Sequence, residues 1–411
     1  LFTDIPIRFR NPVLELPPPL TELELFRELT TLAKRNSVPG DYTCFLGAGV
    51  YRHFIPSVVS AMISRGEFLT SYTPYQPEVS QGTLQATYEF QSLICELTGM
   101  DAANAGMYDG ASAMAEAALM ACRVTHRDNV VVLDTVNPRY RAVLDTYLRP
   151  QGIGISTVSW DQLQIDDSTA CMLAQYPNFY GGIEAMGMLS DSAHREGSLL
   201  VVSANPVALG MFKAPGDYGA DIVTGETQPI GVPMSFGGPF VGYFTCKIDY
   251  IRQMPGRIVG RTVDHDGRVG YVLTLQTREQ HIRRERATSN ICTSEALIAT
   301  GTAVCMAALG PSGLRQMAHL CYQKSHYAAE AINALDGYRV INHGAWFHEF
   351  VVTCPQSSKE TTQKLVERGI IGGLDISDVE PNGILFCVTE MNTKLEIDFL
   401  VETLKKISTG L

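Results

Sequence analysis

The sequence predicts a large α/β domain followed by a small α+β domain, and three observations support this fold class. Between residues 41 and 310, short β-branched runs alternate with segments of helical periodicity. Runs such as Leu199–Val202 are apolar at every position, which is typical of central strands in a mainly parallel sheet covered by helices. After Pro311 the pattern changes to a long helix, three strands and two helices. We therefore divide the chain into residues 1–40, 41–310 and 311–411.

The first 40 residues differ from the rest of the chain. The Pro17–Pro19 run cannot join a sheet and favours an extended polyproline path. Leu23, Phe26 and Leu29 then recur at helical spacing ahead of Pro39, which predicts one amphipathic helix. We expect this segment to form an arm that lies on a neighbouring surface.

The elements of the two domains follow from the same periodicity. In the large domain we expect strands at 129–134, 154–159, 170–174, 198–203, 221–224 and 240–247, and helices at 80–98, 110–127, 139–148 and 182–196. In the small domain we expect helices at 312–335, 358–368 and 394–406, and strands at 338–341, 347–353 and 384–389.

Charge and composition exclude several classes of protein. The 43 acidic residues outnumber the 32 basic residues, and the net charge of −11 repels nucleic-acid phosphates and anionic lipids. The charge-free runs 227–246 and 296–314 are long enough to cross a membrane, but prolines and glycines interrupt them, so no membrane span is predicted. The ten cysteines are dispersed without a Cys-x-x-Cys pair, which is typical of buried thiols in a reducing cytoplasm.

The common hydrolase, nucleotide and metal motifs are missing from the sequence. His319, His326, His343 and His348 form neither a His-Glu-x-x-His motif nor a Cys/His cluster, so no metal site is expected. A better candidate is Asp109–Ala113, which opens an alanine-rich helix whose free N–H groups could hold a phosphate. A capped, buried helix explains the same residues equally well.

Four longer motifs resemble those of the glycine decarboxylase P-protein family. They are residues 71–82 (SYTPYQPEVSQG), 221–229 (DIVTGETQP), 235–239 (SFGGP) and 284–293 (RERATSNICT). The resemblance begins near Asp4 and is strongest to the separate first, or alpha, subunit that some bacteria make instead of one long polypeptide. It implies the pyridoxal-phosphate (PLP)-dependent transferase fold of the aspartate-aminotransferase type, in agreement with the two domains expected above.

The resemblance also places the residues that would hold PLP, and they do not suit the coenzyme. PLP needs a lysine for its Schiff base, an acidic residue at its pyridinium nitrogen and donors around its phosphate. Ser203 stands at the acidic position and Gln228 at the lysine position, and neither can perform that chemistry. Asp109, which opens the phosphate helix with Ser112, would place a carboxylate beside a dianion. We expect these positions to be degenerate and this chain to be inactive alone.

The resemblance implies a partner that carries the coenzyme. It implies an α2β2 assembly in the bacterial cytoplasm, with PLP on the beta subunit (subunit 2), that decarboxylates glycine and passes the aminomethyl group to lipoylated H-protein. Enzymes of this fold build each active site from both protomers. The candidate residues for completing the partner's site lie in a proline-stiffened loop with two tyrosine rings, and they are Tyr72, Thr73, Tyr75, Gln76 and Glu78. A tight structural loop accounts for the same residues.

Other interpretations stay open. The chain could be an autonomous PLP aminotransferase or decarboxylase that uses Lys213 or Lys247, or a scaffold that stabilises its partner without touching the active site. The basic residues Arg283, Arg284 and Arg286 fit a solvated helix face, and they also fit docking of an acidic H-protein. The Gly/Pro-rich loop at 227–238 fits both a cleft wall and simple turns.

Overall fold

The computed structural model describes residues 2–291, 294–342 and 344–410, and the chain forms two compact units that meet between Thr43 and Cys44. Cys292, Thr293 and His343, which enter the sequence analysis, lie outside the described residues. The shorter unit contains the proline run and the first helix, and the longer unit contains both predicted sheets.

The predicted amphipathic helix is present in the shorter unit as α1 (Glu22–Ala33), after an extended proline run. A capping box closes its first turn: the Thr21 side chain accepts from the backbone N–H of Glu24, and the Glu24 carboxylate accepts from the backbone N–H of Thr21. The apolar side chains that recur along α1 are exposed, with Phe26 at 70%.

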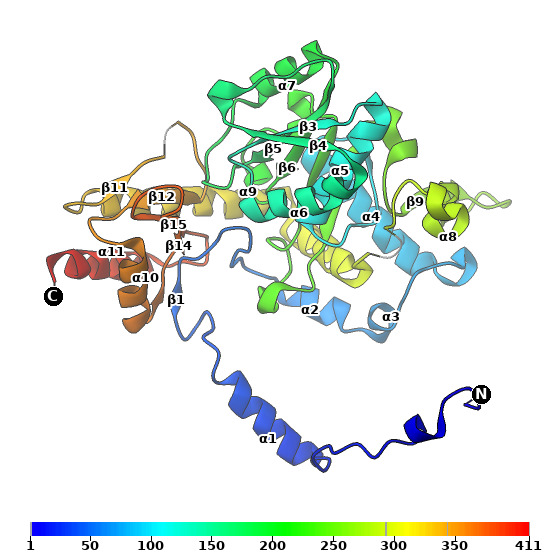
Figure 1. Cartoon of the computed structure of the whole chain (residues 1–411), viewed down its shortest axis with the longest axis horizontal. Helices are drawn as coiled ribbons and strands as arrows, with labels where there is room; N and C mark the ends of the chain where they lie inside the picture. The colour runs from blue at the N-terminus through cyan, green and yellow to red at the C-terminus, as the bar shows by residue number, and fades with distance from the viewer. Residues whose placement is uncertain (1, 292–293, 343, 411) are drawn as a thin grey trace. The chain divides into compact units, whose positions relative to one another are not determined.

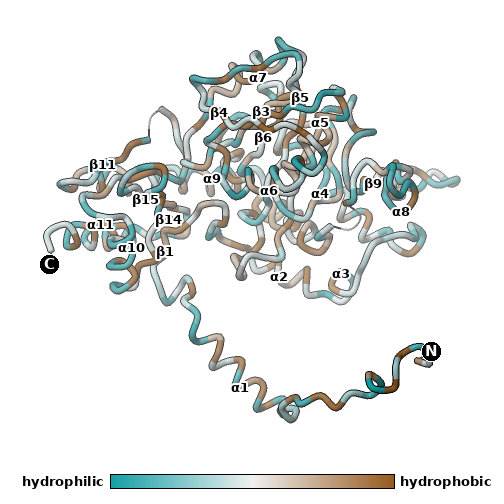
Figure 2. The backbone as a smooth tube through the Cα atoms, viewed as in Figure 1, coloured by the Kyte–Doolittle hydropathy of each residue, from teal (hydrophilic) through white to brown (hydrophobic). Residues whose placement is uncertain are grey.

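A seven-stranded sheet forms the core of the longer unit (Figures 1 and 2). Five strands run parallel to one another. At one edge β8 pairs antiparallel with β7, and β2 pairs antiparallel with β8. Every residue of β6, β7 and β8 is buried, which confirms the mainly parallel central sheet predicted from the apolar runs. The order across the sheet is β2 (Ala102–Ala103), β8 (Gly242–Cys246), β7 (Ile222–Glu226), β6 (Leu199–Ala204), β5 (Thr169–Tyr176), β3 (Asn129–Leu133) and β4 (Gly154–Val158).

Helices pack against this sheet, and α5 contacts β5, β6, β7 and β8. The helix expected from residue 182 begins later, at Met186, because the Asn178 side chain accepts from the N–H groups of Tyr180 and Gly182 and holds this segment as a loop. The helices between residues 44 and 290 are α2 (Ser57–Ile63), α3 (Gly66–Leu69), α4 (Gln81–Thr98), α5 (Gly110–Thr125), α6 (Pro138–Leu148), α7 (Met186–Arg195) and α8 (Gln280–Arg283).

An antiparallel hairpin that was not predicted from the sequence consists of β9 (Ile258–Val263) and β10 (Val269–Thr274). The Asp264 carboxylate closes its turn by accepting from the N–H groups of Asp266 and Arg268. The hairpin packs on α4 rather than joining the large sheet. The outer half of β9 is exposed and most of β10 is half-buried, so the hairpin lacks the full burial at every position that marks the central strands.

The predicted C-terminal sheet is antiparallel in the order β11 (Arg339–Val340), β12 (Glu349–Thr353), β15 (Gly383–Cys387) and β14 (Leu374–Asp375). This sheet and α11 (Lys394–Thr409) pack on α9 (Ala296–Asn333), and α10 (Ser358–Glu367) packs on α11 and β14. Figure 1 shows α9 running from the large sheet to this region. The remaining short strands are β1 (Thr43–Cys44) and β13 (Ile370–Ile371).

Helix α9 changes direction at Gly310, which has non-helical angles of φ 60° and ψ −180° just before Pro311. The expected helix from residue 312 is thus the second half of a longer one. Within the part of the chain that the structure describes, α9 alone is long and apolar enough to cross a membrane. Buried residues such as Ala299 and Cys305 pack it against α2 and α4, so α9 is a core helix of the fold.

Candidate functional site

The structure brings the four positions expected to be degenerate together at one end of the large sheet. Ser203 lies in β6, and Gln228 follows the end of β7 at Glu226. Asp109 is the N-cap of α5, whose first turn contains Ser112. The backbone N–H of Gly110 donates to the Glu226 carboxylate at 3.0 Å and so joins the helix to the strand. All of these groups except Asp109 are buried.

Glu226, which the sequence analysis did not single out, fills the space in front of α5. Its Oε2 accepts from the N–H of Gly110, and its Oε1 accepts from the N–H groups of Gln228 and Val241, both at 3.1 Å. Burial raises the pKa of Glu226 to about 7, although the three N–H donors act in the opposite direction. This carboxyl group takes up an N–H at the helix end, where a phosphate would otherwise be bound.

Asp109 and Ser112 cap the first turn of α5 with reciprocal side-chain hydrogen bonds. The Asp109 carboxylate accepts from the N–H of Ser112 at 2.7 Å, and the Ser112 hydroxyl accepts from the N–H of Asp109 at 3.2 Å. This is a reciprocal capping box. A phosphate dianion here would lie beside the Asp109 carboxylate, which Coulomb repulsion opposes, and Glu226 already accepts the N–H of Gly110.

Gln228 is equally committed to structural contacts. Its Oε1 accepts from the N–H of Tyr51 at 2.8 Å, and its Nε2 donates to the carbonyl groups of Tyr51 and Val232. The cavity that Ser203 and Glu226 line beside it has a volume of about 30 Å³. Pockets for small molecules usually measure about 300–1,000 Å³, so the residues present do not fit PLP.

The two lysines considered as Schiff-base residues lie elsewhere. Lys213 is exposed, and its ammonium group lies 4.4 Å from the ring centre of Tyr218. Lys247 forms an ion pair with the buried Asp221 at 2.6 Å. Neither residue lines the cavity beside Ser203.

The proline-stiffened loop that precedes α4 lies on the surface. Tyr72 is 71% exposed and Tyr75 is 54% exposed, Gln76 and Glu78 are exposed, and Thr73 is half-buried. The structure therefore presents four of the five candidate side chains outward, in a form that a partner could contact. Behind the loop is a cavity of about 300 Å³ lined by residues of the loop, the hairpin and the start of α9.

Arg257, immediately before β9, contacts this loop, and the sequence analysis missed it. Its guanidinium donates to the Thr73 hydroxyl at 2.8 Å and to the Tyr75 hydroxyl at 3.2 Å. The same group lies 5.0 Å from the centre of the Tyr75 ring, within the range of a cation–π contact. Its partners are more than 180 residues away in the sequence, so no local pattern could have revealed the contact.

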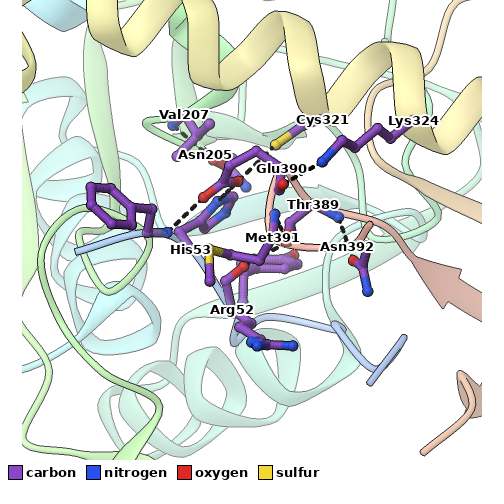
Figure 3. A network of polar contacts seen from close by, with 12 residues as sticks. Arg52, His53, Asn205, Val207, Cys321, Lys324, Thr389, Glu390, Met391 and Asn392 are labelled. Carbon is purple, nitrogen blue, oxygen red and sulfur yellow. Dashed lines mark hydrogen bonds and ion pairs between the residues drawn. The ribbon is translucent and has the colours of Figure 1, made fainter. Parts of the chain in front are cut away.

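A second cluster of polar side chains lies beneath α9 (Figure 3). His53, Cys321 and Glu390 each bring one possible metal-ligand atom within 4.8 Å of the others. The Glu390 carboxylate lies 2.7 Å from His53 Nδ1 and accepts from the Cys321 thiol at 3.3 Å, and Lys324 Nζ donates to the Glu390 carbonyl. Nitrogen and oxygen ligands of a tetrahedral zinc ion would stand about 3.3 Å apart, so the 2.7 Å contact is that of a hydrogen bond.

The remaining candidates have surface or turn environments. Arg283, Arg284 and Arg286 are exposed, which suits both a solvated face and a docking surface. In the 227–238 loop, residues 227–232 are buried, and Pro229 lines the small cavity beside Ser203.

The sheet order and the paired large and small regions define the PLP-dependent fold of type I, the aspartate-aminotransferase class. A sphingosine-1-phosphate lyase of Burkholderia pseudomallei shares this fold, with a TM-score of 0.66, 16% identity and coverage of 98% of this chain and 94% of that chain. The chain itself belongs to the glycine cleavage system P-protein family, whose model matches residues 1–404.

Relatives of higher identity agree with this family. "Probable glycine dehydrogenase (decarboxylating) subunit 1" of Thermomicrobium roseum is 50% identical over 420 residues, which cover 99% of this chain and 94% of that protein. The protein of the same name from Desulforamulus reducens is 50% identical over 421 residues, with the same coverage. A crystal structure of glycine decarboxylase (P-protein) of the glycine cleavage system, in inhibitor-bound form, has a TM-score of 0.95, 42% identity and coverage of 99% and 94%.

Proposed function

We propose that this chain is the subunit of a two-subunit glycine decarboxylase that holds no PLP and completes the active site of a PLP-bearing subunit. The observation that carries the proposal is the Glu226 carboxyl group, which accepts the N–H at the end of α5 that would otherwise face a phosphate. Gln228 at the lysine position and the small adjoining cavity support the same conclusion. Together these features support the absence of a coenzyme site from this chain.

The proposed assembly is α2β2, with PLP on subunit 2, glycine as substrate and lipoylated H-protein as the acceptor of the aminomethyl group, in the bacterial cytoplasm. Membership of the P-protein family and the name "subunit 1" of the relatives support it. On the partner, PLP supplies an electron sink for the electron pair left when glycine loses carbon dioxide. The activity is that of glycine dehydrogenase (aminomethyl-transferring).

This chain's contribution is the loop that holds Tyr72, Thr73, Tyr75, Gln76 and Glu78. Two tyrosine rings with exposed faces give flat apolar area and hydroxyl donors in one short segment. When a partner surface covers the loop, water is excluded and each hydroxyl acts in a medium of lower dielectric constant. The loop thereby orients and shields a substrate bound on the other subunit.

Conservative substitutions in the loop test this role. Tyr72→Phe and Tyr75→Phe each remove one hydroxyl and little volume, so both variants should still assemble with subunit 2. Loss of one well-placed polar group in a dry site lowers rates by roughly 10- to 1,000-fold, and we expect glycine–bicarbonate exchange to fall within that range. Gel filtration and exchange should be measured on the same samples.

Tyr327→Phe is the matched control, because Tyr327 is also exposed and lies in α9, outside the tyrosine loop. Its hydroxyl donates to Asp398 in α11. It should assemble and retain the wild-type exchange rate. Wild-type rates in both assembled loop variants would contradict the shared-site role and favour a scaffold that only stabilises its partner.

A separate measurement tests the absence of PLP. The chain purified alone should bind no coenzyme covalently and should not decarboxylate glycine. Borohydride reduction followed by peptide mass spectrometry detects covalently bound coenzyme, because the reduction converts any Schiff base between a lysine and pyridoxal phosphate into a stable adduct. A stoichiometric adduct on Lys213 or Lys247 would overturn the proposal in favour of an autonomous enzyme.

A further inference from the structure

Arg257 is held in one orientation by a buried carboxylate. It is 8% exposed, and its Nε donates to Oε2 of Glu279, which is 5% exposed, at 3.2 Å. His281 approaches the same oxygen at 3.5 Å. Because Glu279 fixes the Nε edge of the guanidinium, the two terminal nitrogens point in a defined direction, toward Thr73 and Tyr75.

The hairpin that follows Arg257 holds the other end of the same loop. Gln81, the first residue of α4, donates through Nε2 to the carbonyl groups of Pro77 at 2.6 Å and Tyr271 at 2.9 Å. Its Oε1 accepts from the N–H of Tyr271 at 2.8 Å. Tyr271 lies in β10, so the segment from residue 73 to residue 81 is attached at both ends to one element.

We infer that Arg257 is a positioning residue that, with the β9–β10 hairpin, fixes the tyrosine loop in the geometry needed at the partner's active site. This inference rests on the proposed function of the loop. Arg257 acts through Thr73 and Tyr75 rather than on the reacting atoms, and Gln81 joins the end of the loop to β10.

The geometry requires an arginine at this position. A planar guanidinium can donate to Glu279, Thr73 and Tyr75 at the same time and still face the Tyr75 ring. The ammonium group of a lysine is a single point charge that can satisfy Glu279 but cannot reach both hydroxyls in the fork geometry. Arg257→Lys therefore keeps the buried charge balanced and removes the positioning contacts.

The test uses Arg257→Lys in the complex with subunit 2, with Arg261→Lys as the control. Arg261 lies four residues after Arg257, within β9, and it is exposed. Amide hydrogen exchange of residues 71–80 reports the order of the loop, and glycine–bicarbonate exchange reports the activity. We expect loop protection to fall by about 10-fold or more in Arg257→Lys, and the control to match wild type in both measurements.

The exchange activity of Arg257→Lys should also fall, mainly in kcat, by roughly 10- to 100-fold. A displacement of about 1 Å in a positioned group commonly lowers the rate by this factor. A double-mutant cycle adds a second readout: Tyr75→Phe should cost little further activity once Arg257 is lysine, because both changes break one contact. Gln81→Ala should also lower the hydrogen-exchange protection of residues 71–80, because it removes the contacts at the other end of the loop.

The possible outcomes separate this inference from the proposed function. Loss of both loop protection and activity supports both of them. Loss of loop protection with wild-type activity supports positioning by Arg257 and overturns the catalytic role of the loop. Wild-type loop protection in Arg257→Lys overturns the inference whatever the activity, and so do fully additive effects with Tyr75→Phe.

Discussion

Replacement of Glu226 by glutamine tests whether a neutral carboxyl group occupies the end of α5. Glutamine has the same shape as the protonated acid, but its NH₂ group cannot accept a hydrogen bond. Glu226 accepts from Gly110 on one oxygen and from Gln228 and Val241 on the other, so at least one buried N–H loses its acceptor in the variant. Such a loss costs about 1–3 kcal/mol of the free energy of unfolding.

The pH dependence of this cost has a definite sign. Burial raises the pKa of Glu226 to about 7 in the folded chain, above the value of about 4.3 expected when unfolded. The folded state therefore binds the proton more tightly, and the stability that this provides is lost as the pH rises toward 7. Glutamine does not titrate, so the cost of Glu226→Gln should shrink by about 2 kcal/mol between about pH 5 and pH 7.

Urea unfolding followed by circular dichroism measures this cost at each pH. Glu367→Gln, at an exposed position in α10, should stay within about 0.5 kcal/mol of wild type throughout. If the cost of Glu226→Gln stays constant or grows between these pH values, the carboxyl group is ionised in the fold, and the assignment of a neutral acid at the helix end is wrong.

Two further predictions concern other buried contacts. Gly110→Ala should lower the free energy of unfolding by about 1–3 kcal/mol, because the new Cβ would lie 2.4 Å from the Tyr140 hydroxyl. The control is Gly187→Ala in α7, whose new Cβ would meet nothing within 4 Å. In the same urea titration this control should be neutral or stabilising. Burial would raise the pKa of Glu390, but the hydrogen bond and charge of His53 lower it overall. The resulting stability should be present above about pH 4.3 and lost in more acidic solution, and Glu390→Gln should abolish that loss when thermal unfolding is followed against pH.

The sequence identified the central sheet well because burial leaves a local pattern. Leu199–Val202 is apolar at every position, and the structure buries all of β6 on both faces. Gln228 lies within the 221–229 motif and Ser203 was assigned from the family resemblance, and their status as degenerate coenzyme positions stays a prediction. What the motifs could not reveal is that Glu226 accepts the N–H of Gly110 at the start of α5, because this contact joins residues 116 positions apart.

The hairpin and Arg257 were missed for a related physical reason. Half of β9 is exposed, so its sequence shows no alternation of apolar and polar residues that would distinguish a strand from a loop. Arg257 looks like any surface cation in the sequence, and only the fold places it beside Glu279 in a buried pair. The loop itself was predicted because its prolines and tyrosines are adjacent in the chain, whereas the elements that support it are distant.

The proposed loss of the coenzyme site and the proposed role of the loop have a common physical basis. A helix end buried in a protein must have its N–H groups satisfied, and in enzymes of this fold a phosphate group can serve that purpose. Here Asp109 and Glu226 supply the acceptors from within the chain, so α5 is capped without an external ligand. The packing of α5 on the large sheet therefore needs no phosphate to satisfy these N–H groups. The large sheet can continue to support α4, the hairpin and the exposed loop with Tyr72, which is the part of the fold that a catalytic partner would use.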